Sequence, residues 1–247
     1  MRKNSIGNDI VVLTNTGIDR ACNPRFYSKF LTDRESALFN TNDLAISFVQ
    51  FVWLCWSIKE SVYKFQKRLQ PQLLKGGWKI QVHSINPPAI SFPVSQHKLL
   101  ESELIPVEFC YASVAVINTE KYYSWSIITP EFIYTITAAE NEYENICWGI
   151  KKIGDANRLN QSSEVRKFLL ARLRSSNAEI LKTPAGIPYI KQHPHALLSF
   201  THDSFFIAYA LLLNNEALQK NKAAYYCKQS NEAGFNNYSC FNWVIKC

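Results

Sequence analysis

The stretch WSIKESVYK, residues 56–64, lies inside a segment from 43 to 69 that contains neither glycine nor proline. The segment is apolar at first and then carries charged residues three or four positions apart, which predicts one long helix. At 100° per residue, Trp56, Glu60 and Lys64 fall on neighbouring positions of one helix face. We therefore expect a helix that presents a carboxylate and a cation along the same face.

Two shorter segments precede this helix. Residues 10–13 form an apolar, β-branched run behind Gly7, which predicts a buried strand with Asp9 at its start. The stretch TDRE at 32–35 has the spacing of a capping box and predicts a helix from Asp33. The sequence thus places an acidic residue on a strand, and another helix, ahead of the long helix.

The regions beyond residue 77 are rich in β-branched and aromatic runs bounded by turn residues. These runs predict strands at residues 78–85, 108–117, 122–128 and 132–137. Farther along, the sequence predicts a helix at 165–173 and strands at 189–190 and 197–200, and it leaves open the type of an apolar segment at 205–213.

The order of these elements predicts the fold class. The chain runs twice from a helix-rich opening to a short sheet, so we expect an α+β fold of two tandem lobes, each a small antiparallel sheet packed with helices. The expected lobes are residues 1–130 and residues 131–247.

Composition limits the kind of protein. A chain of 247 residues with 47% hydrophobic residues can bury a substantial core, which argues against disorder. The net charge of +7 favours an anionic partner but does not identify it. The most apolar stretch, 45–58, is short of the roughly 20 residues that cross a bilayer, and the seven cysteines form no C-x-x-C pair. We expect a soluble cytoplasmic protein that binds no membrane.

Two acidic positions, Asp9 on the strand and Glu60 on the helix, are candidates for a magnesium site if the fold brings them together. Mg²⁺ prefers a few carboxylates together with water and phosphate oxygens. The alternative is structural: Asp9 caps a turn, and Glu60 pairs with Lys64 four residues later.

Several basic side chains are candidates for phosphate contacts through charge-assisted hydrogen bonds, although most such residues on helices are simply solvated. They include Lys59, Lys64, Arg158 and Arg166. His202 follows an apolar strand, where a lone histidine is usually structural. The chain contains no Walker, dinucleotide-binding or H-E-x-x-H motif, so those enzyme classes lose support.

Four segments in this order resemble a known family. GNDIV at 7–11, KFLTDRE at 29–35 and WSIKESVYK at 56–64 resemble the signature of the 4′-phosphopantetheinyl transferases, and the last matches the pattern W-[SCT]-x-K-E-[SA]-x-x-K in full. GIPY at 186–189 with SFTHD at 199–203 is similar to the G-K-P and S-x-S-H motifs of the family, with isoleucine replacing the usual lysine and threonine the usual serine.

The motif order differs from that of the two-lobed, surfactin-type members, in which the G-K-P and S-H motifs come first. The resemblance therefore implies a circular permutation, with the usual second lobe at 1–130 followed by the usual first lobe. Such a permutation is plausible where the new termini lie close together. The alternative is a single synthase-like unit with a long insertion.

The resemblance implies a reaction. The phosphopantetheine arm of coenzyme A would be transferred to a serine of an apo acyl or peptidyl carrier protein, with release of adenosine 3′,5′-bisphosphate. Asp9 and Glu60 would hold Mg²⁺ on the pyrophosphate, with Glu60 as general base. Lys64 would bind coenzyme A and stabilise the departing oxygen.

The remaining coenzyme A contacts implied by the resemblance come from the other lobe. They are Thr201 and His202 of the fourth motif, and Arg158 and Arg166 at the adenosine phosphate end. The resemblance implies a monomeric pseudo-dimer that binds no nucleic acid. Two other classes stay open: an inactive relative that only binds coenzyme A or a carrier protein, and a basic nucleic-acid-binding module.

Overall fold

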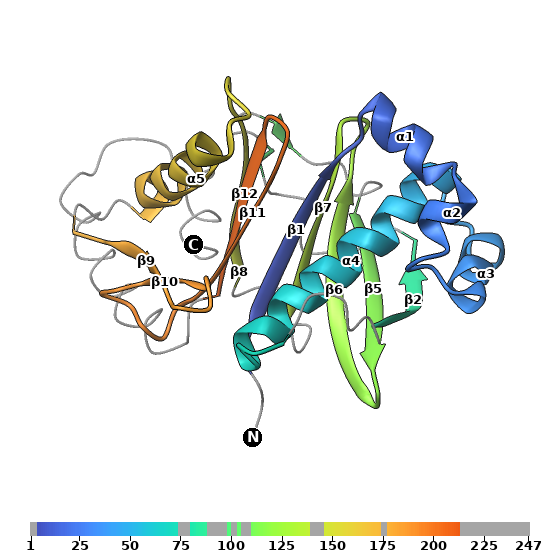
Figure 1. The fold of residues 1–247 in the computed structure, drawn as a ribbon, viewed down its shortest axis with the longest axis horizontal. Coiled ribbons are helices and arrows are strands. Elements are labelled where there is room, and N and C mark those ends of the chain that lie inside the picture. The colour runs from blue at the N-terminus through green and yellow to red at the C-terminus, as the bar shows by residue number, and fades with distance from the viewer. Residues whose placement is uncertain are drawn as a thin grey trace, which may run out of the picture.

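The computed structural model describes residues 4–73, 80–87, 98–99, 103–104, 110–138, 146–173 and 177–212. Two antiparallel sheets lie next to one another, with the long helix α4 crossing the first sheet and α5 lying against the second (Figure 1). The expected α+β class with antiparallel sheets and helices is confirmed. None of the described helices is long and apolar enough to cross a bilayer.

The helices before residue 70 begin where capping side chains allow. α4 spans Phe48–Leu69, five residues later than expected from the sequence, because Ser47 and Gln50 form a capping box that sets its start. α3 spans Asp33–Thr41 and begins at the predicted capping box of Thr32 and Glu35. Two helices that the sequence did not predict precede it, α1 at Asn15–Ala21 and α2 at Pro24–Tyr27.

The first sheet has the strand order β1-β7-β6-β5-β2 and confirms all four strands predicted between residues 78 and 137. Its strands are β1 (Ile6–Val12), β2 (Gln81–Asn86), β5 (Cys110–Ile117), β6 (Glu120–Ile128) and β7 (Phe132–Ala138). Because β7 pairs with both β1 and β6, this sheet extends past the lobe boundary expected at residue 130.

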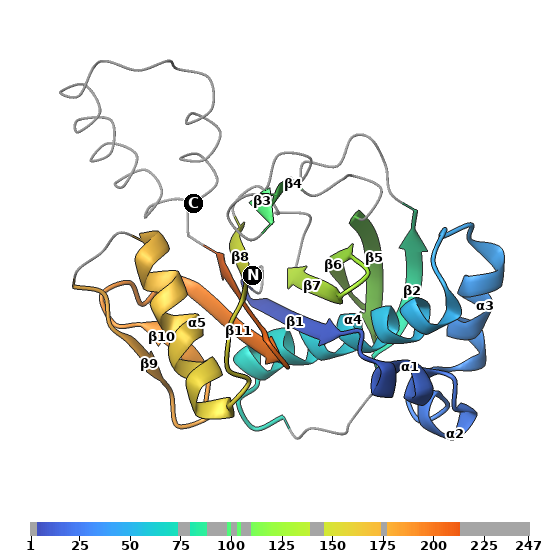
Figure 2. The ribbon, with the colours of Figure 1, turned by 90° about the horizontal axis from the view of Figure 1, so that it is seen from above.

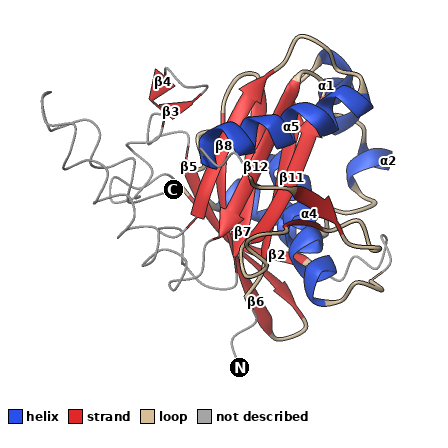
Figure 3. Cartoon of the chain, turned by 90° about the vertical axis from the view of Figure 1, so that its left-hand side faces the viewer, coloured by secondary structure: helices blue, strands red, loops and turns tan. Residues whose placement is uncertain are grey.

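The second sheet has the order β11-β12-β8 and carries α5 on its outer face (Figure 3). Its strands are β8 (Ile146–Lys152), β11 (Leu197–Asp203) and β12 (Phe206–Leu212), and α5 spans Arg158–Leu173. The apolar segment of undecided type is therefore the strand β12, α5 starts seven residues earlier than predicted, and β8 was not predicted.

Two small strand pairs complete the described elements. β9 (Ile180–Lys182) pairs with β10 (Pro188–Ile190), and β3 (Lys98–Leu99) pairs with β4 (Glu103–Leu104). The stretch from 191 to 196, which contains two histidines around a proline, is a turn after β10.

Alternating side chains bury both faces of the first sheet, as expected for a period of two along a strand. On β1, Val11 packs in the cluster around α4, whereas Ile6 and Ile10 pack in a second cluster with β8 and β12. The first sheet therefore lies between α4 on one face and the second sheet on the other (Figure 2). This layering brings the edge strands β1 and β11 together.

Candidate functional site

Gly7 lets β1 approach α4 more closely than any other residue would allow. A Cβ atom at this position would lie 1.9 Å from the Ser61 carbonyl oxygen and 2.7 Å from the Phe65 backbone nitrogen. Both atoms belong to the helix backbone, which cannot move aside without disturbing the helix. Two residues farther along β1, Asp9 is therefore placed against the same helix.

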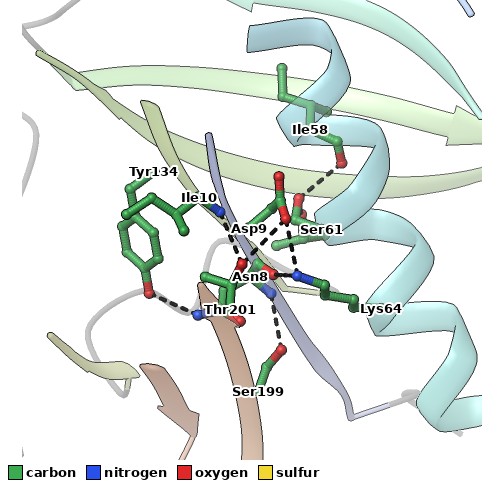
Figure 4. A network of polar contacts seen from close by, with 10 residues as sticks. Asn8, Asp9, Ile10, Ile58, Ser61, Lys64, Tyr134, Ser199 and Thr201 are labelled. Carbon is green, nitrogen blue, oxygen red and sulfur yellow. Dashed lines mark hydrogen bonds and ion pairs between the residues drawn. The ribbon is translucent and has the colours of Figure 1, made fainter. Parts of the chain in front are cut away.

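Asp9 is tied to the helix through Lys64 (Figure 4). The Lys64 ammonium lies 3.0 Å from Asp9 Oδ1 and donates a second hydrogen bond to the Asn8 carbonyl oxygen at 2.8 Å. Lys64 therefore pairs with the strand that carries Asp9. An ammonium has three donors, so one proton remains for a ligand.

Glu60 lies near Asp9, and both carboxylates are buried, with 6% and 7% exposure. Burial raises the pKa of Asp9 from 3.8 to about 6, Lys64 opposes that increase, and the negative charge of Glu60 adds to it. The fold thus brings together the two acidic residues that the sequence singled out. A cation between them would relieve the cost of holding two negative charges out of water.

β11 lies beside β1 on the other side of Asp9, and the hydrogen bonds between the two strands run from the backbone of β1 to side chains of β11. The backbone N–H groups of Asn8, Ile10 and Val12 donate to the side chains of Ser199, Thr201 and Asp203 at 3.2, 3.2 and 2.7 Å. Thr201 Oγ1 also donates to Asp9 Oδ1 at 3.4 Å. The SFTHD segment therefore fixes the edge of one sheet to the edge of the other.

A cleft of about 220 Å³ opens beside this junction. Its walls come from α4, α5, β1, β11 and the hairpin formed by β9, β10 and the turn between them. The basic side chains among the lining residues are Lys64, Lys67, Arg68, Lys182 and His202, and the lining contains no carboxylate. The cleft is therefore suited to a ligand with several negative charges.

His202 is partly buried in this cleft, and burial lowers its pKa, with the positive charges of Lys64 and Arg158 acting in the same direction. Asp203 opposes this effect, and Lys182 adds to it. An anion that binds beside this imidazole would raise the pKa of His202, because the negative charge favours the protonated form.

The other predicted phosphate contacts lie in different surroundings. Lys59 is buried, forms an ion pair with Glu35 at 2.8 Å and donates to the Phe30 carbonyl oxygen. The hypothesis that Lys59 contacts phosphate is therefore wrong, because this lysine joins α4 to the KFLTDRE segment. Glu35 in turn accepts from the backbone N–H of Val82 at 2.6 Å, which adds β2 to the same junction.

Three other predicted residues lie near the cleft without lining it. Arg158 is exposed at the first position of α5, and its charge acts on His202. Arg166 donates to Ser162, and Ser162 lines the cleft. Thr201 is buried between β1 and Asp9.

The sequence did not predict Lys67, Arg68 or Lys182 as site residues. One signal was present for Arg68, which continues the row formed by Glu60 and Lys64 at intervals of four along the helix. Lys182 carried no such signal, because its position depends on the pairing of β9 with β10.

The described residues fit a magnesium ion only in part. They contain no group of three or more histidine, cysteine or acidic side chains that could enclose a metal. Two neighbouring carboxylates beside a basic cleft nevertheless match an ion that takes its other ligands from water and substrate phosphates.

A comparison with protein families matches residues 5–107 to the 4′-phosphopantetheinyl transferase superfamily. The match contains the three segments GNDIV, KFLTDRE and WSIKESVYK, and it ends before the GIPY and SFTHD segments. No curated protein and no solved structure matches the chain.

Proposed function

We propose that this protein, whose residues 5–107 belong to the 4′-phosphopantetheinyl transferase superfamily, transfers the 4′-phosphopantetheine arm of coenzyme A to a serine of an apo carrier protein. The observation that carries the proposal is the position of Lys64. This side chain contacts Asp9 on one side and lines the basic cleft on the other. It therefore joins the carboxylate pair to the place where a polyanion would bind.

The two carboxylates are suited to hold Mg²⁺. Asp9 and Glu60 would hold the ion, and the chemistry supplied by a bound Mg²⁺ would be neutralisation of charge on the transferring phosphoryl group. The mutual repulsion of the two carboxylates, which contributes to the raised pKa of Asp9, supports this assignment.

Glu60 is the proposed general base. It accepts the proton of the carrier serine as the serine oxygen forms a bond to the phosphorus that carries the pantetheine arm. The bond between that phosphorus and the bridging oxygen breaks at the same centre, and the electron pair leaves on adenosine 3′,5′-bisphosphate. Atoms and charge balance without an oxidant or reductant.

Lys64 and His202 act on the phosphates from opposite walls. Lys64 stabilises the negative charge that develops on the departing oxygen. His202 contacts a phosphate from β11, and Thr201 holds Asp9 and the backbone of β1 in place. Arg158 and Arg166 supply positive charge at the adenosine end of coenzyme A. Arg158 lies near enough to His202 for its charge to lower the pKa of that histidine.

We further propose that residues 146–212 form the second lobe of the enzyme, in permuted order. The support is that β11, α5 and the turn at 185–188 supply one wall of the cleft, while α4 supplies the other. Since one chain provides both walls, the protein would act as a monomer. Carrier proteins are typically acidic, so the net charge of +7 favours their approach.

The proposal is tested by incubating the full chain with coenzyme A, Mg²⁺ and a panel of apo carrier proteins of the fatty-acid, polyketide and peptide-synthesis types. We expect at least one carrier to gain the mass of the phosphopantetheine arm, with equimolar release of adenosine 3′,5′-bisphosphate. Tight coenzyme A binding without any mass gain across the panel would instead identify an inactive binding relative.

A further inference from the structure

Ser57 is a completely buried serine of α4 whose hydroxyl is not used within the helix. Its exposed fraction is 0%, and among the described residues its Oγ has no hydrogen-bond partner. Serine hydroxyls inside helices commonly donate to a carbonyl oxygen three or four residues earlier, as Ser61 does to Ile58 at 2.9 Å. A buried hydroxyl without an acceptor costs free energy of folding. Helix packing therefore gives no reason for a hydroxyl at this position.

The packing of β1 along α4 follows a regular step. Ser5 Oγ donates to the Phe65 carbonyl oxygen at 2.8 Å. Two residues along β1 and four residues back along α4, Gly7 lies against the Ser61 carbonyl oxygen. Two strand residues cover about 6.6 Å and four helix residues cover about 6 Å, so the two elements stay in step.

The next pair in this register is Asp9 with Ser57. The threonine opposite Asp9 on β7, Thr135, is already bonded to Ser126 at 2.9 Å. Burial has the largest effect on the pKa of Asp9 and raises it, whereas Lys64 and, more weakly, Ser57 lower it. The Ser57 hydroxyl therefore lies within reach of the Asp9 carboxylate, although it does not complete a hydrogen bond in this structure.

The two side chains that do bond to the Asp9 carboxylate also serve other contacts. Lys64 and Thr201 both donate to Oδ1, at 3.0 and 3.4 Å. Lys64 in addition lines the cleft, and Thr201 accepts from the backbone of β1. Ser57 is not among the residues that line the cleft, so a bond from its hydroxyl would hold the carboxylate whatever ligand Lys64 contacts.

We propose that Ser57 is a positioning residue for Asp9: by a hydrogen bond it holds the carboxylate in the orientation that faces Glu60 and a divalent cation. Ser57 itself is not a ligand of the cation. The inference rests on the proposed function, which assigns Asp9 and Glu60 to Mg²⁺. Two measurements test it, one of the contact and one of its effect on cation binding, and neither requires transfer to a carrier protein.

The first measurement is a double-mutant cycle between Ser57→Ala and Asp9→Ala, in which denaturant unfolding of the full chain is followed at pH 8 in EDTA. With Asp9 intact, Ser57→Ala removes a hydrogen bond to a carboxylate and is expected to lower the denaturant midpoint. Combined with Asp9→Ala, the same substitution removes a hydroxyl that has no acceptor, so it is expected to leave the midpoint unchanged or to raise it.

Ser61→Ala is the matched control for this cycle. Ser61 is also 0% exposed and lies on the same helix, but its hydroxyl donates to the Ile58 carbonyl oxygen. Its removal is expected to change the midpoint by the same amount with and without Asp9→Ala. The control therefore separates a specific contact with Asp9 from the general cost of removing a buried hydroxyl.

The second measurement is the binding of Mn²⁺, used in place of Mg²⁺, to the full chain in the presence of coenzyme A. The EPR signal of the free ion is compared with that of a sample without protein. We expect Ser57→Ala to weaken Mn²⁺ binding about tenfold, because the carboxylate loses a hydrogen bond that fixes its orientation.

Two further variants show whether the hydroxyl itself is responsible. Ser57→Cys, which keeps the size of the side chain but is a weak donor, should weaken Mn²⁺ binding as Ser57→Ala does. Ser57→Thr keeps the hydroxyl and should retain the affinity of the wild type, as should Ser61→Ala. Thermal unfolding shows which variants are folded, and if Ser57→Thr is not, Ser57→Cys and Ser57→Ala decide the question by the same affinity.

The outcomes separate this inference from the proposed function. Equal effects of Ser57→Ala with and without Asp9→Ala, or a Mn²⁺ affinity that Ser57→Ala and Ser57→Cys leave unchanged, overturn the inference even if the protein transfers phosphopantetheine. A wild type that binds no Mn²⁺ overturns it as well. Coupling to Asp9 together with weakened Mn²⁺ binding supports the inference even if no carrier is modified, and in that case only the proposed transfer fails.

Discussion

The Lys64 ammonium lies 3.0 Å from Asp9 Oδ1 and 2.8 Å from the Asn8 carbonyl oxygen, so one side chain of α4 is bonded twice to β1. These contacts hold the acidic strand against the helix that carries Glu60. They also place the Lys64 ammonium between the buried carboxylate pair and the open cleft. The chemistry proposed for this protein depends on this position of Lys64.

Gly7→Ala tests the close approach that creates the site. The added methyl group would lie 1.9 Å from the Ser61 carbonyl oxygen, so β1 must move away from α4. We expect a loss of about 3 kcal/mol in the free energy of unfolding, measured with denaturant, and a larger loss of transfer activity than of stability. Gly154→Ala is the matched control, because a Cβ there meets nothing within 4 Å. Equal effects of the two substitutions would refute the steric explanation.

Asp9→Asn tests the electrostatic cost of the site. Since the pKa of Asp9 is raised from 3.8 to about 6, the folded state binds a proton more tightly than the unfolded state, and stability falls as pH rises between those values. At about 1.4 kcal/mol per pKa unit, ionisation of Asp9 costs about 3 kcal/mol above pH 6.

We therefore expect Asp9→Asn to be more stable than the wild type above pH 6 in the presence of EDTA, and to lose this advantage as pH falls to 4. The measurement is denaturant unfolding at several pH values. Transfer activity should be lost at all of them, because the variant lacks one carboxylate. A stability difference that does not change with pH would contradict the assigned burial cost.

His202 is expected to take up a proton when a phosphate ligand binds. Its pKa is lowered in the free protein by burial and by the cations around it, so it is mostly neutral at pH 7. A bound phosphate raises that pKa, and affinity should therefore increase as pH falls from about 8 towards 6. Calorimetry of adenosine 3′,5′-bisphosphate binding in buffers of different ionisation enthalpy measures the uptake directly.

His202→Gln separates this effect from protonation of the phosphate itself. The variant should bind more weakly, raise the KM for coenzyme A more than it lowers kcat, and lose most of the proton uptake. If His202→Gln takes up as many protons as the wild type, the histidine is not the group that responds to the ligand.

Much of the fold follows from local sequence signals. Capping residues predicted the start of α3, and β-branched runs predicted the strands of the first sheet. The helices α1 and α2, the strand β8 and the short strands β3, β4 and β9 were not predicted. β8 has a mixed pattern in which Trp148 and Gly149 interrupt the apolar residues, and its place in the sheet depends on pairing with β12.

The sequence predicted the site residues that lie within the recognised motifs, and not those outside them. Asp9, Glu60 and Lys64 were identified, but the partner of Lys64 was open, because a helix alone cannot reveal that a strand with glycine at position 7 packs against it. Arg68 and Lys182 come from segments 114 residues apart in the chain, and only the docking of β10 and β11 on α4 brings them to one cleft. Lys59 lies within a motif, but its side chain forms a buried ion pair with Glu35 and has a structural role.

The proposed transfer is tested most directly by the mass of an apo carrier protein after incubation with coenzyme A, Mg²⁺ and either the wild type or Glu60→Gln. We expect the wild type to add one phosphopantetheine arm, and the folded variant to add none while it still binds adenosine 3′,5′-bisphosphate. Glu131→Gln, which alters an exposed glutamate paired with Lys152, should act like the wild type. A Glu60→Gln variant that modifies the carrier at a rate near that of the wild type would contradict the assignment of Glu60 as the base.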